Sequence, residues 1–178
     1  MLDLACGGGR HTRLFRAQGH PVTAVDRDLA GIADLAGDLE VEAIDADLEQ
    51  APWPLDQRRF AGIVVVNYLW RPLFPRLFDA LAKGGVLIYE TFAKGNGRFG
   101  QPRNPDYLLA PGELLERVAG RLHVVAFEHG IVAEPRPAAV QRLCAVNAPA
   151  DPDQLTVLPS ATQHLLPLVD RTGSSGEP

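Results

Sequence analysis

The chain has 178 residues, a formal net charge of −5 at pH 7 and a 46% share of hydrophobic residues. This length is typical of a single domain with a substantial core, and the negative charge disfavours a nucleic acid as the main partner. No apolar run is long enough to cross a bilayer, and no secretory signal is visible. The two cysteines, Cys6 and Cys144, are too few for a disulfide framework, which favours a reducing, cytoplasmic location.

The first residues indicate a strand, a glycine-rich turn and a helix. Residues 1–4 are apolar apart from Asp3, three glycines follow at positions 7–9, and residues 12–17 have a helix-like pattern. Glycines let backbone N–H groups approach a ligand closely and allow positive φ angles in a tight turn. In an open α/β sheet, the carboxyl end of such a strand and the N-terminus of the next helix face a ligand-binding crevice.

Further strands and helices alternate along the chain. The expected strands are Val22–Asp26, Val41–Asp45, Phe60–Val66, 86–90, 122–127 and 139–146, and the expected helices are 28–36, 72–82 and 111–118. The near-continuous apolar run in Phe60–Val66 is typical of a central strand that is buried on both faces. The short link 128–136 predicts that the last two strands pair antiparallel. This alternation predicts an α/β fold with a doubly wound, mostly parallel sheet.

Two other stretches differ from this pattern. Residues 91–110 form a long loop rich in Gly, Asn, Pro and Arg, and loops of this length are usually functional or mobile. We expect its Lys94, Arg98 and Arg103 to belong to a lid over a binding site. Periodicity is lost after residue 147, so we predict a domain over 1–147 and a partly disordered C-terminal tail over 148–178.

The stretch Asp3-Leu-Ala-Cys-Gly-Gly-Gly9 resembles motif I of class I S-adenosylmethionine (SAM) dependent methyltransferases, Asp/Glu-x-Gly-x-Gly-x-Gly, with Ala5 where the first Gly is common. The resemblance covers roughly 1–147, and within the family the chain is similar to small bacterial, TehB-like enzymes. It implies a seven-stranded Rossmann-like sheet in the order 3-2-1-4-5-7-6, with the last strand antiparallel. The family's usual N-terminal helices do not precede the first strand. We therefore expect an open side of the crevice, with either reduced SAM affinity or a second copy of the chain covering it as a homo-oligomer.

The resemblance implies SAM as the cofactor and S-adenosylhomocysteine as its product. The expected cofactor-binding residues are Asp3, Ala5, Cys6, Gly7, Gly9, Asp26, Arg27, Asp47, Leu48 and Asn67. Asp26 ends a strand, where a carboxylate can accept hydrogen bonds from both ribose hydroxyls. In the family, an acid after the third strand commonly contacts the adenine amino group, a role that fits Asp47 better than Asp45. Arg27 lies along the adenine or is solvated, and Asn67 faces the methionine end of SAM or merely ends its strand.

Asp3 bears on the choice between SAM and NAD. A buried carboxylate beneath the glycine loop would repel the pyrophosphate of NAD, whereas it attracts the ammonium and sulfonium groups of SAM. The spacing Gly7-x-Gly9 is also followed by Thr12, where the dinucleotide fingerprint has a third Gly or Ala. Cys6 has no His–Asp partner set and is interpreted as a small loop residue, not a nucleophile. The histidines show no metal-ligand spacing, so we predict no metal site.

We therefore expect transfer of a methyl group from SAM to a small-molecule acceptor. Such a displacement depends on alignment more than on acid–base groups, and we predict no particular catalytic base. The residues expected to line the acceptor site are Tyr68, Trp70, Arg71, Glu90 and Phe92. The alternatives are a SAM-binding or partner-binding domain without turnover and, less favoured, an NAD-dependent oxidoreductase. The sequence does not identify the acceptor.

Overall fold

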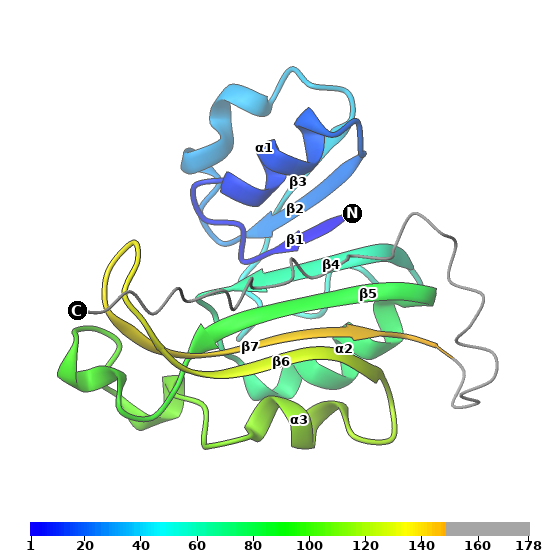
Figure 1. Ribbon diagram of the computed structural model, residues 1–178. Coiled ribbons are helices and arrows are strands. Elements are labelled where there is room, and N and C mark those ends of the chain that lie inside the picture. Colours follow the sequence, from blue (N-terminus) through cyan, green and yellow to red (C-terminus); the bar gives the residue numbers. More distant parts are fainter. Residues whose placement is uncertain (149–178) are drawn as a thin grey trace, which may run out of the picture.

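A computed structural model describes residues 1–148, which form an α/β fold around one seven-stranded sheet (Figure 1). The strands are β1 (Leu2–Leu4), β2 (Val22–Asp26), β3 (Val41–Asp45), β4 (Phe60–Val66), β5 (Leu81–Phe92), β6 (His123–Val132) and β7 (Ala138–Val146). The α-helices are α1 (Arg10–Ala17), α2 (Phe74–Ala80) and α3 (Glu113–Val118). The strand order is β3-β2-β1-β4-β5-β7-β6, with β7 antiparallel to both of its neighbours. This arrangement confirms the predicted fold class and strand order.

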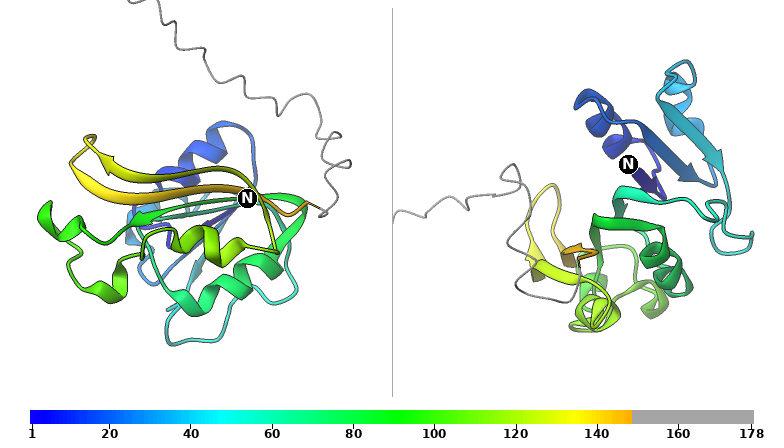
Figure 2. Two further views of the ribbon diagram at one scale, coloured as in Figure 1. Left: turned by 60° about the horizontal axis from the view of Figure 1, so that its bottom comes forward. Right: turned by 90° about the vertical axis from the view of Figure 1, so that its right-hand side faces the viewer.

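The sheet buries apolar side chains on both faces. Successive residues of a strand point to opposite faces, and β2 shows this directly. Val25 belongs to the main core cluster, together with Leu77 of α2 and Leu114 of α3. Its neighbour Ala24 packs in a separate cluster with Ile32. Figures 1 and 2 show α2 and α3 on the same face of the sheet, and α1 beside β1 and β2. Strands β1 and β2 are therefore covered on both sides.

The predicted helix over 28–36 is wrong, because this segment holds only a short 3-10 helix, η1 (Ala30–Leu35). The Asp28 carboxylate accepts a hydrogen bond from the first N–H of η1 at 2.9 Å, in a local turn. Gly31 lies so close to the glycine loop that a Cβ there would stand 2.7 Å from the Gly7 carbonyl oxygen. The segment is therefore shaped by its contact with the loop, which no helical pattern in the sequence reveals.

The boundary between α2 and β5 also differs from the prediction. We expected a helix to residue 82 and a strand from 86, but α2 ends at Ala80 and β5 begins at Leu81. Leu81 pairs with Phe60 of β4, so strand pairing replaces the last helical turn. A short 3-10 helix, η2 (Arg71–Leu73), precedes α2.

The long loop after β5 is ordered by short turns and by one arginine. It contains the 3-10 helices η3 (Asn96–Arg98) and η4 (Pro105–Tyr107). The Arg71 guanidinium donates hydrogen bonds to the carbonyl oxygens of Asp106 at 2.6 Å and Leu108 at 3.0 Å. This arginine therefore fixes the second half of the loop against the start of α2. The expectation that the loop acts as a lid stays a prediction.

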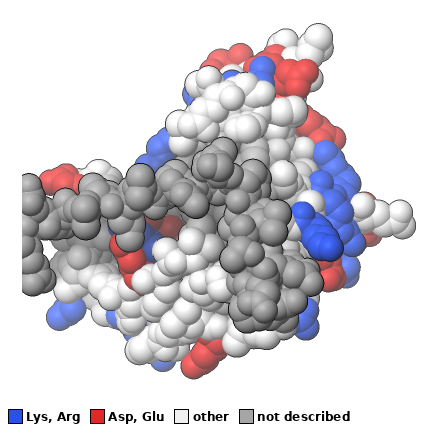
Figure 3. All heavy atoms as spheres, turned by 45° about the vertical axis from the view of Figure 1, so that its right-hand side comes forward, with Lys and Arg blue, Asp and Glu red and all other residues white. Residues whose placement is uncertain are grey.

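One face of the β5 region carries exposed apolar surface. Leu87 and Tyr89 are buried in the main core, whereas Ile88 between them points to the opposite face and is 45% exposed. On the side of the molecule shown in Figure 3, charged side chains lie mostly toward the margins and uncharged side chains occupy much of the surface between them. The expected open side of the crevice, and its coverage by a second copy, stay predictions.

The predicted tail over 148–178 lies outside the described residues except for residue 148. The domain boundary at 147 therefore stays a prediction. Among residues 1–148, no helix combines the length and the apolar character that a membrane crossing requires.

Candidate functional site

The glycine loop between β1 and α1 is fastened to the end of β2. The Gly7 N–H donates a hydrogen bond to Asp26 Oδ2 at 2.8 Å, and the Cys6 N–H donates to the Val25 carbonyl oxygen at 3.1 Å. Gly9 precedes α1 with a φ of 69°, and a Cβ at this position would overlap the Ile32 side chain. Glycine is therefore required at position 9 by both backbone conformation and space.

Asp3 lies beneath this loop, and the hydrogen bonds of its side chain are made to another residue of the chain, Thr12. Its side chain is buried, and Asp3 Oδ2 accepts hydrogen bonds from the Thr12 N–H at 2.8 Å and the Thr12 hydroxyl at 2.6 Å. Burial raises the pKa of the Asp3 carboxyl, although the Thr12 hydrogen bonds and His11 oppose this. Asp3 does not line the cavity described below, so the structure gives it the role of joining β1 to the first turn of α1.

Ala5 has a backbone conformation that glycine adopts more easily. Its φ is 55°, in the left-handed region, and its side chain lines the main cavity. The strain of a non-glycine residue there is on the order of 1–2 kcal/mol. The family motif has glycine at this point, and the structure supplies the physical reason for that preference.

We expect Ala5→Gly to stabilise the protein by about 0.5–1 kcal/mol, because relief of strain exceeds the extra entropy of glycine in the unfolded chain. Urea unfolding measures this change. Ala46→Gly is the matched control, since Ala46 lines the same cavity without a positive φ. That control is expected to lose stability, and a loss of similar size in Ala5→Gly would contradict the strain argument.

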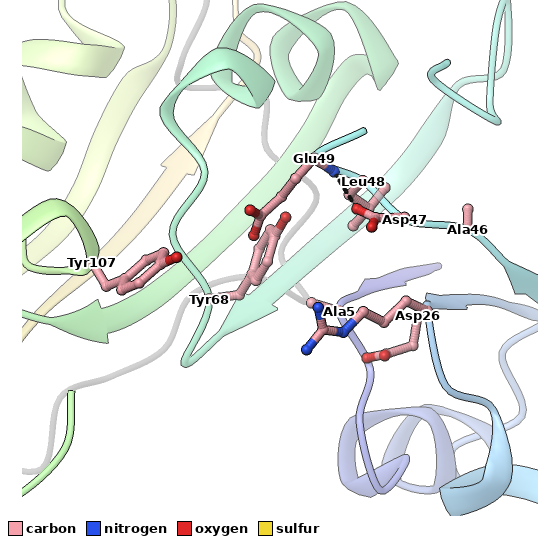
Figure 4. Close-up of a pocket in the computed structure, with 9 residues that line it drawn as sticks. Ala5, Asp26, Ala46, Asp47, Leu48, Glu49, Tyr68 and Tyr107 are labelled. Atoms are coloured by element: carbon pink, nitrogen blue, oxygen red, sulfur yellow. Dashed lines mark hydrogen bonds between the residues drawn. The ribbon is translucent and has the colours of Figure 1, made fainter. Parts of the chain in front are cut away.

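A cavity of about 300 Å³ opens at the carboxyl ends of the first strands (Figure 4). Its lining residues are Ala5, Asp26, Arg27, Ala46, Asp47, Leu48, Glu49, Tyr68 and Tyr107. The charged members are three carboxylates and one guanidinium, so the cavity favours a cationic ligand. Asp26 uses one oxygen for the Gly7 N–H and the other for the Asp28 N–H at 3.1 Å, and each oxygen has further lone pairs for a ligand.

The structure distinguishes Asp47 from its competitor Asp45. Asp47 lines the cavity, and its Oδ1 accepts backbone hydrogen bonds from Glu49 at 2.9 Å and Gln50 at 3.2 Å. Asp45 pairs with Asp26 in the register of β2 and β3, but it is exposed and does not line the cavity. Asp47 therefore lies at the cavity and Asp45 does not, and the contact of Asp47 with adenine stays a prediction.

A second cavity of about 370 Å³ adjoins the first. It is lined by Glu49, Asn67, Tyr68, Leu69, Thr91, Phe92, Gln101, Pro102, Tyr107 and Arg136. Glu49, Tyr68 and Tyr107 line both cavities, so they form a shared wall. Asn67, at the end of β4, has a φ of 56° and lines only this second cavity.

Tyr68 presents its hydroxyl to this shared wall. Figure 4 shows the Glu49 carboxylate directed toward the Tyr68 ring end, and the buried Tyr68 hydroxyl has no hydrogen-bond partner of standard geometry among the described residues. Burial, together with the charges of Glu49 and Asp47, raises the pKa of the Tyr68 hydroxyl. The Tyr68 hydroxyl therefore stays protonated at neutral pH. The Tyr89 hydroxyl fixes the backbone of this residue by donating to the Tyr68 carbonyl oxygen at 2.9 Å.

Three of the residues expected at the acceptor site lie outside both cavities. Arg71 forms an ion pair with Glu113 at 2.7 Å, and Glu90 forms one with Arg142 at 2.6 Å. Trp70 packs against the main core. Their side chains are used in packing and ion pairs, so the structure does not support them as acceptor contacts, whereas it brings Tyr68 and Phe92 to the second cavity.

Of the expected cofactor residues, Cys6, Gly7 and Gly9 shape the loop without lining either cavity. Burial, helped by the charges of Asp3 and Asp26, raises the pKa of the Cys6 thiol to about 12. A thiol with this pKa is inert as a nucleophile at neutral pH, in agreement with its interpretation as a small loop residue.

The sequence analysis missed several residues of the two cavities. They are Ala46, Glu49, Leu69, Thr91, Gln101, Pro102, Tyr107 and Arg136. Glu49 had a signal in the sequence, because it follows Asp47 in the same turn after a strand. Tyr107 lies in the long loop 91–110, whose length indicated a functional segment without singling out this residue. Arg136, in the link between β6 and β7, had no signal.

The fold and the acidic cavity at the strand ends define an α/β domain with a candidate ligand-binding site. Residues 1–85 match the methyltransferase domain family. The chain is also 30% identical over 135 residues to a malonyl-[acyl-carrier protein] O-methyltransferase of Serratia marcescens, a match that covers 71% of this chain and 47% of that protein. The chain therefore spans about half the length of this curated relative.

Solved structures share the fold. TehB from Haemophilus influenzae superposes with a TM-score of 0.66 at 17% identity, over 82% of this chain and 57% of that chain. A Burkholderia thailandensis 1,6-didemethyltoxoflavin-N1-methyltransferase, solved with 1,6-didemethyltoxoflavin and S-adenosylhomocysteine, gives 0.59 at 21% identity, over 83% and 70%. The match of residues 1–85 to the methyltransferase domain family confirms the resemblance seen in motif I.

Proposed function

We propose that this protein is a SAM-dependent methyltransferase whose first cavity binds the cofactor and whose second cavity binds a small-molecule acceptor. The observation that carries this proposal is the shared wall of Glu49, Tyr68 and Tyr107 between two adjoining cavities. A donor in one cavity and an acceptor in the other would meet at this wall. The family match and the names of the related enzymes support the same reaction.

The charges of the first cavity fit SAM better than NAD. Asp26, Asp47 and Glu49 line it, and the buried Asp3 carboxylate lies under the glycine loop. These groups attract the ammonium and sulfonium groups of SAM, and they disfavour a pyrophosphate. The volume of about 300 Å³ lies at the lower end of the range of small-molecule pockets, about 300–1,000 Å³.

The residues of the chain have distinct roles in this proposal. When bound, SAM supplies an electrophilic methyl group on a positively charged sulfur. Asp26 accepts hydrogen bonds from the ribose hydroxyls, and Asp47 with the Leu48 N–H receives the adenine edge. Tyr68 and Phe92 contact the acceptor and exclude water from the reaction. Alignment of two bound reactants can contribute on the order of 7–11 kcal/mol to catalysis, so no strong acid or base is needed.

Calorimetry with S-adenosylhomocysteine and with NAD tests the cofactor, and methyl transfer from labelled SAM to a panel of small acceptors tests the activity. We expect binding of S-adenosylhomocysteine, no binding of NAD, and turnover on members of the panel. Binding without turnover would favour a SAM-binding or partner-binding domain, and NAD binding would overturn the proposal.

A further inference from the structure

The second cavity carries two opposite charges at different places in its wall. Glu49 and Arg136 are the charged residues among its ten lining residues. Glu49 also lines the first cavity, whereas Arg136 does not. The negative charge therefore lies next to the proposed cofactor position, and the positive charge lies in the part of the second cavity that is not shared.

Arg136 has no ionic partner in the part of the chain that the structure describes. Other arginines near the site are paired, since Arg71 binds Glu113 and Arg142 binds both Glu90 and Glu128. Arg136 forms no ion pair or side-chain hydrogen bond with residues 1–148, and it lies in the link between β6 and β7. Its guanidinium is free to bind a carboxylate in a bidentate manner.

The rest of the second cavity suits a flat, partly apolar molecule. The Phe92, Tyr68 and Tyr107 side chains contribute aromatic surface, and Leu69 and Pro102 add apolar surface. Aromatic rings bind planar ligands by stacking or edge-on contact. Glu49, Asn67, Thr91, Gln101 and Arg136 add polar groups to the wall, and such groups orient a ligand in small-molecule sites.

We infer that the acceptor is a small planar molecule with a carboxylate that binds Arg136 and with a hydroxyl or amine that faces the wall of Glu49 and Tyr68. This inference rests on the proposed function, because it names the substrate class of the same site. It assigns Arg136 to substrate specificity and Glu49 to the end of the cavity where the methyl group arrives.

Methyl transfer at that wall releases a proton from the acceptor, and Glu49 is the residue that takes it up. A lone pair of the acceptor's oxygen or nitrogen forms the new bond to the methyl carbon, and the electron pair of the broken carbon–sulfur bond stays on sulfur. The proton released from the hydroxyl or amine passes to the Glu49 carboxylate. The Tyr68 ring packs beside the acceptor, with its buried hydroxyl at the Glu49 carboxylate, while the carboxylate at Arg136 is left unmethylated.

Binding of a matched pair of probes tests the inference without turnover. The probes are para-hydroxybenzoate and its neutral analogue para-hydroxybenzamide, titrated into the full chain with and without S-adenosylhomocysteine. We expect the wild type to prefer the carboxylate by about tenfold, a modest value because Arg136 is exposed. Arg136→Gln should abolish this preference and leave the affinity for the amide unchanged.

Arg59→Gln is the control for general electrostatics, because Arg59 is an exposed arginine directly before β4 that lines neither cavity. It should retain the preference for the carboxylate. Equal affinities for the two probes in the wild type, or an equal loss in both arginine variants, would overturn the inference. So would a turnover product in which the carboxylate itself is methylated.

The proposed function is judged separately in the same titrations. If S-adenosylhomocysteine binds equally to wild type and Arg136→Gln while the carboxylate preference is absent, the inference fails and the proposed function stands. If S-adenosylhomocysteine does not bind at all, the proposed function fails, and the inference that depends on it fails too.

Discussion

Asp26→Ala is expected to weaken the binding of S-adenosylhomocysteine by roughly ten- to hundredfold, because two charge-assisted hydrogen bonds to the ribose are lost. The carboxylate also accepts the Gly7 N–H at 2.8 Å and the Asp28 N–H at 3.1 Å, so the variant loosens the glycine loop as well. Isothermal titration calorimetry measures the affinity, and thermal unfolding on the same samples shows that the variant remains folded.

Asp45→Ala is the matched control for this experiment. Asp45 sits beside Asp26 in the register of β2 and β3, carries the same charge and is exposed away from the cavity. Its replacement should change the affinity less than threefold, as expected for a screened charge outside the site. Equal losses of affinity in the two variants would mean that Asp26 acts only through its charge at long range and not through contact with the ribose.

Glu113→Gln is expected to lower the free energy of unfolding by about 2–3 kcal/mol at neutral pH, since it removes the charge from a buried ionic network. The Glu113 carboxylate is 8% exposed and binds the Arg71 guanidinium through both oxygens, at 2.7 and 2.9 Å. It also accepts from the Ala110 N–H at 3.0 Å and from Arg117 at 2.9 Å. Urea unfolding of the variant and the wild type gives the difference.

The pH dependence provides a second measurement on Glu113. Burial alone would raise the pKa of this carboxyl, but the hydrogen bonds from Arg71, Ala110 and Arg117 outweigh it and lower the pKa from 4.5 to about 2. The unfolded chain therefore takes up a proton near pH 4.5, before the folded protein does, so stability falls as the pH drops from about 4.5 to about 2. Above that window the contribution of Glu113 is fully present.

Glu116→Gln controls for the loss of a carboxylate from the same helix. Glu116 is exposed and lies in α3 beside Glu113, without a side-chain ion pair to residues 1–148. We expect a change within about 0.5 kcal/mol, as for most surface substitutions. If the stability difference between wild type and Glu113→Gln were constant from pH 7 to pH 3, the network would not depend on the charge of Glu113.

The loop after β5 connects the ionic network of Glu113 with the wall of the proposed acceptor site. Arg71, held by Glu113, donates to the carbonyl oxygens of Asp106 and Leu108, and Tyr107 between them lines both cavities. Loss of this network is therefore expected to loosen one side of the proposed acceptor site, even though neither Arg71 nor Glu113 lines a cavity.

The sequence by itself determined the sheet and the residues that end its first strands. The ranges predicted for three strands are the observed bounds of β2, β3 and β4, namely Val22–Asp26, Val41–Asp45 and Phe60–Val66. Local apolar patterns indicate which strands are buried. Asp26 is the last residue of β2, and Asp47 lies shortly after the end of β3. Their place at one edge of the sheet then follows from parallel strand order.

Only the tertiary structure decided which side chains reach the cavities from distant segments. Arg71 and Glu90 are polar residues near strand ends, as the acceptor prediction requires, but partners far along the chain hold them in ion pairs. Tyr107 and Arg136 reach the site instead, from segments without regular periodicity. The 28–36 segment failed as a helix for the same reason, because its close contact with the glycine loop outweighs its local helical preference. Local patterns encode burial and strand order, whereas the pairing of charges and the closing of loops depend on long-range contacts that no short window of sequence contains.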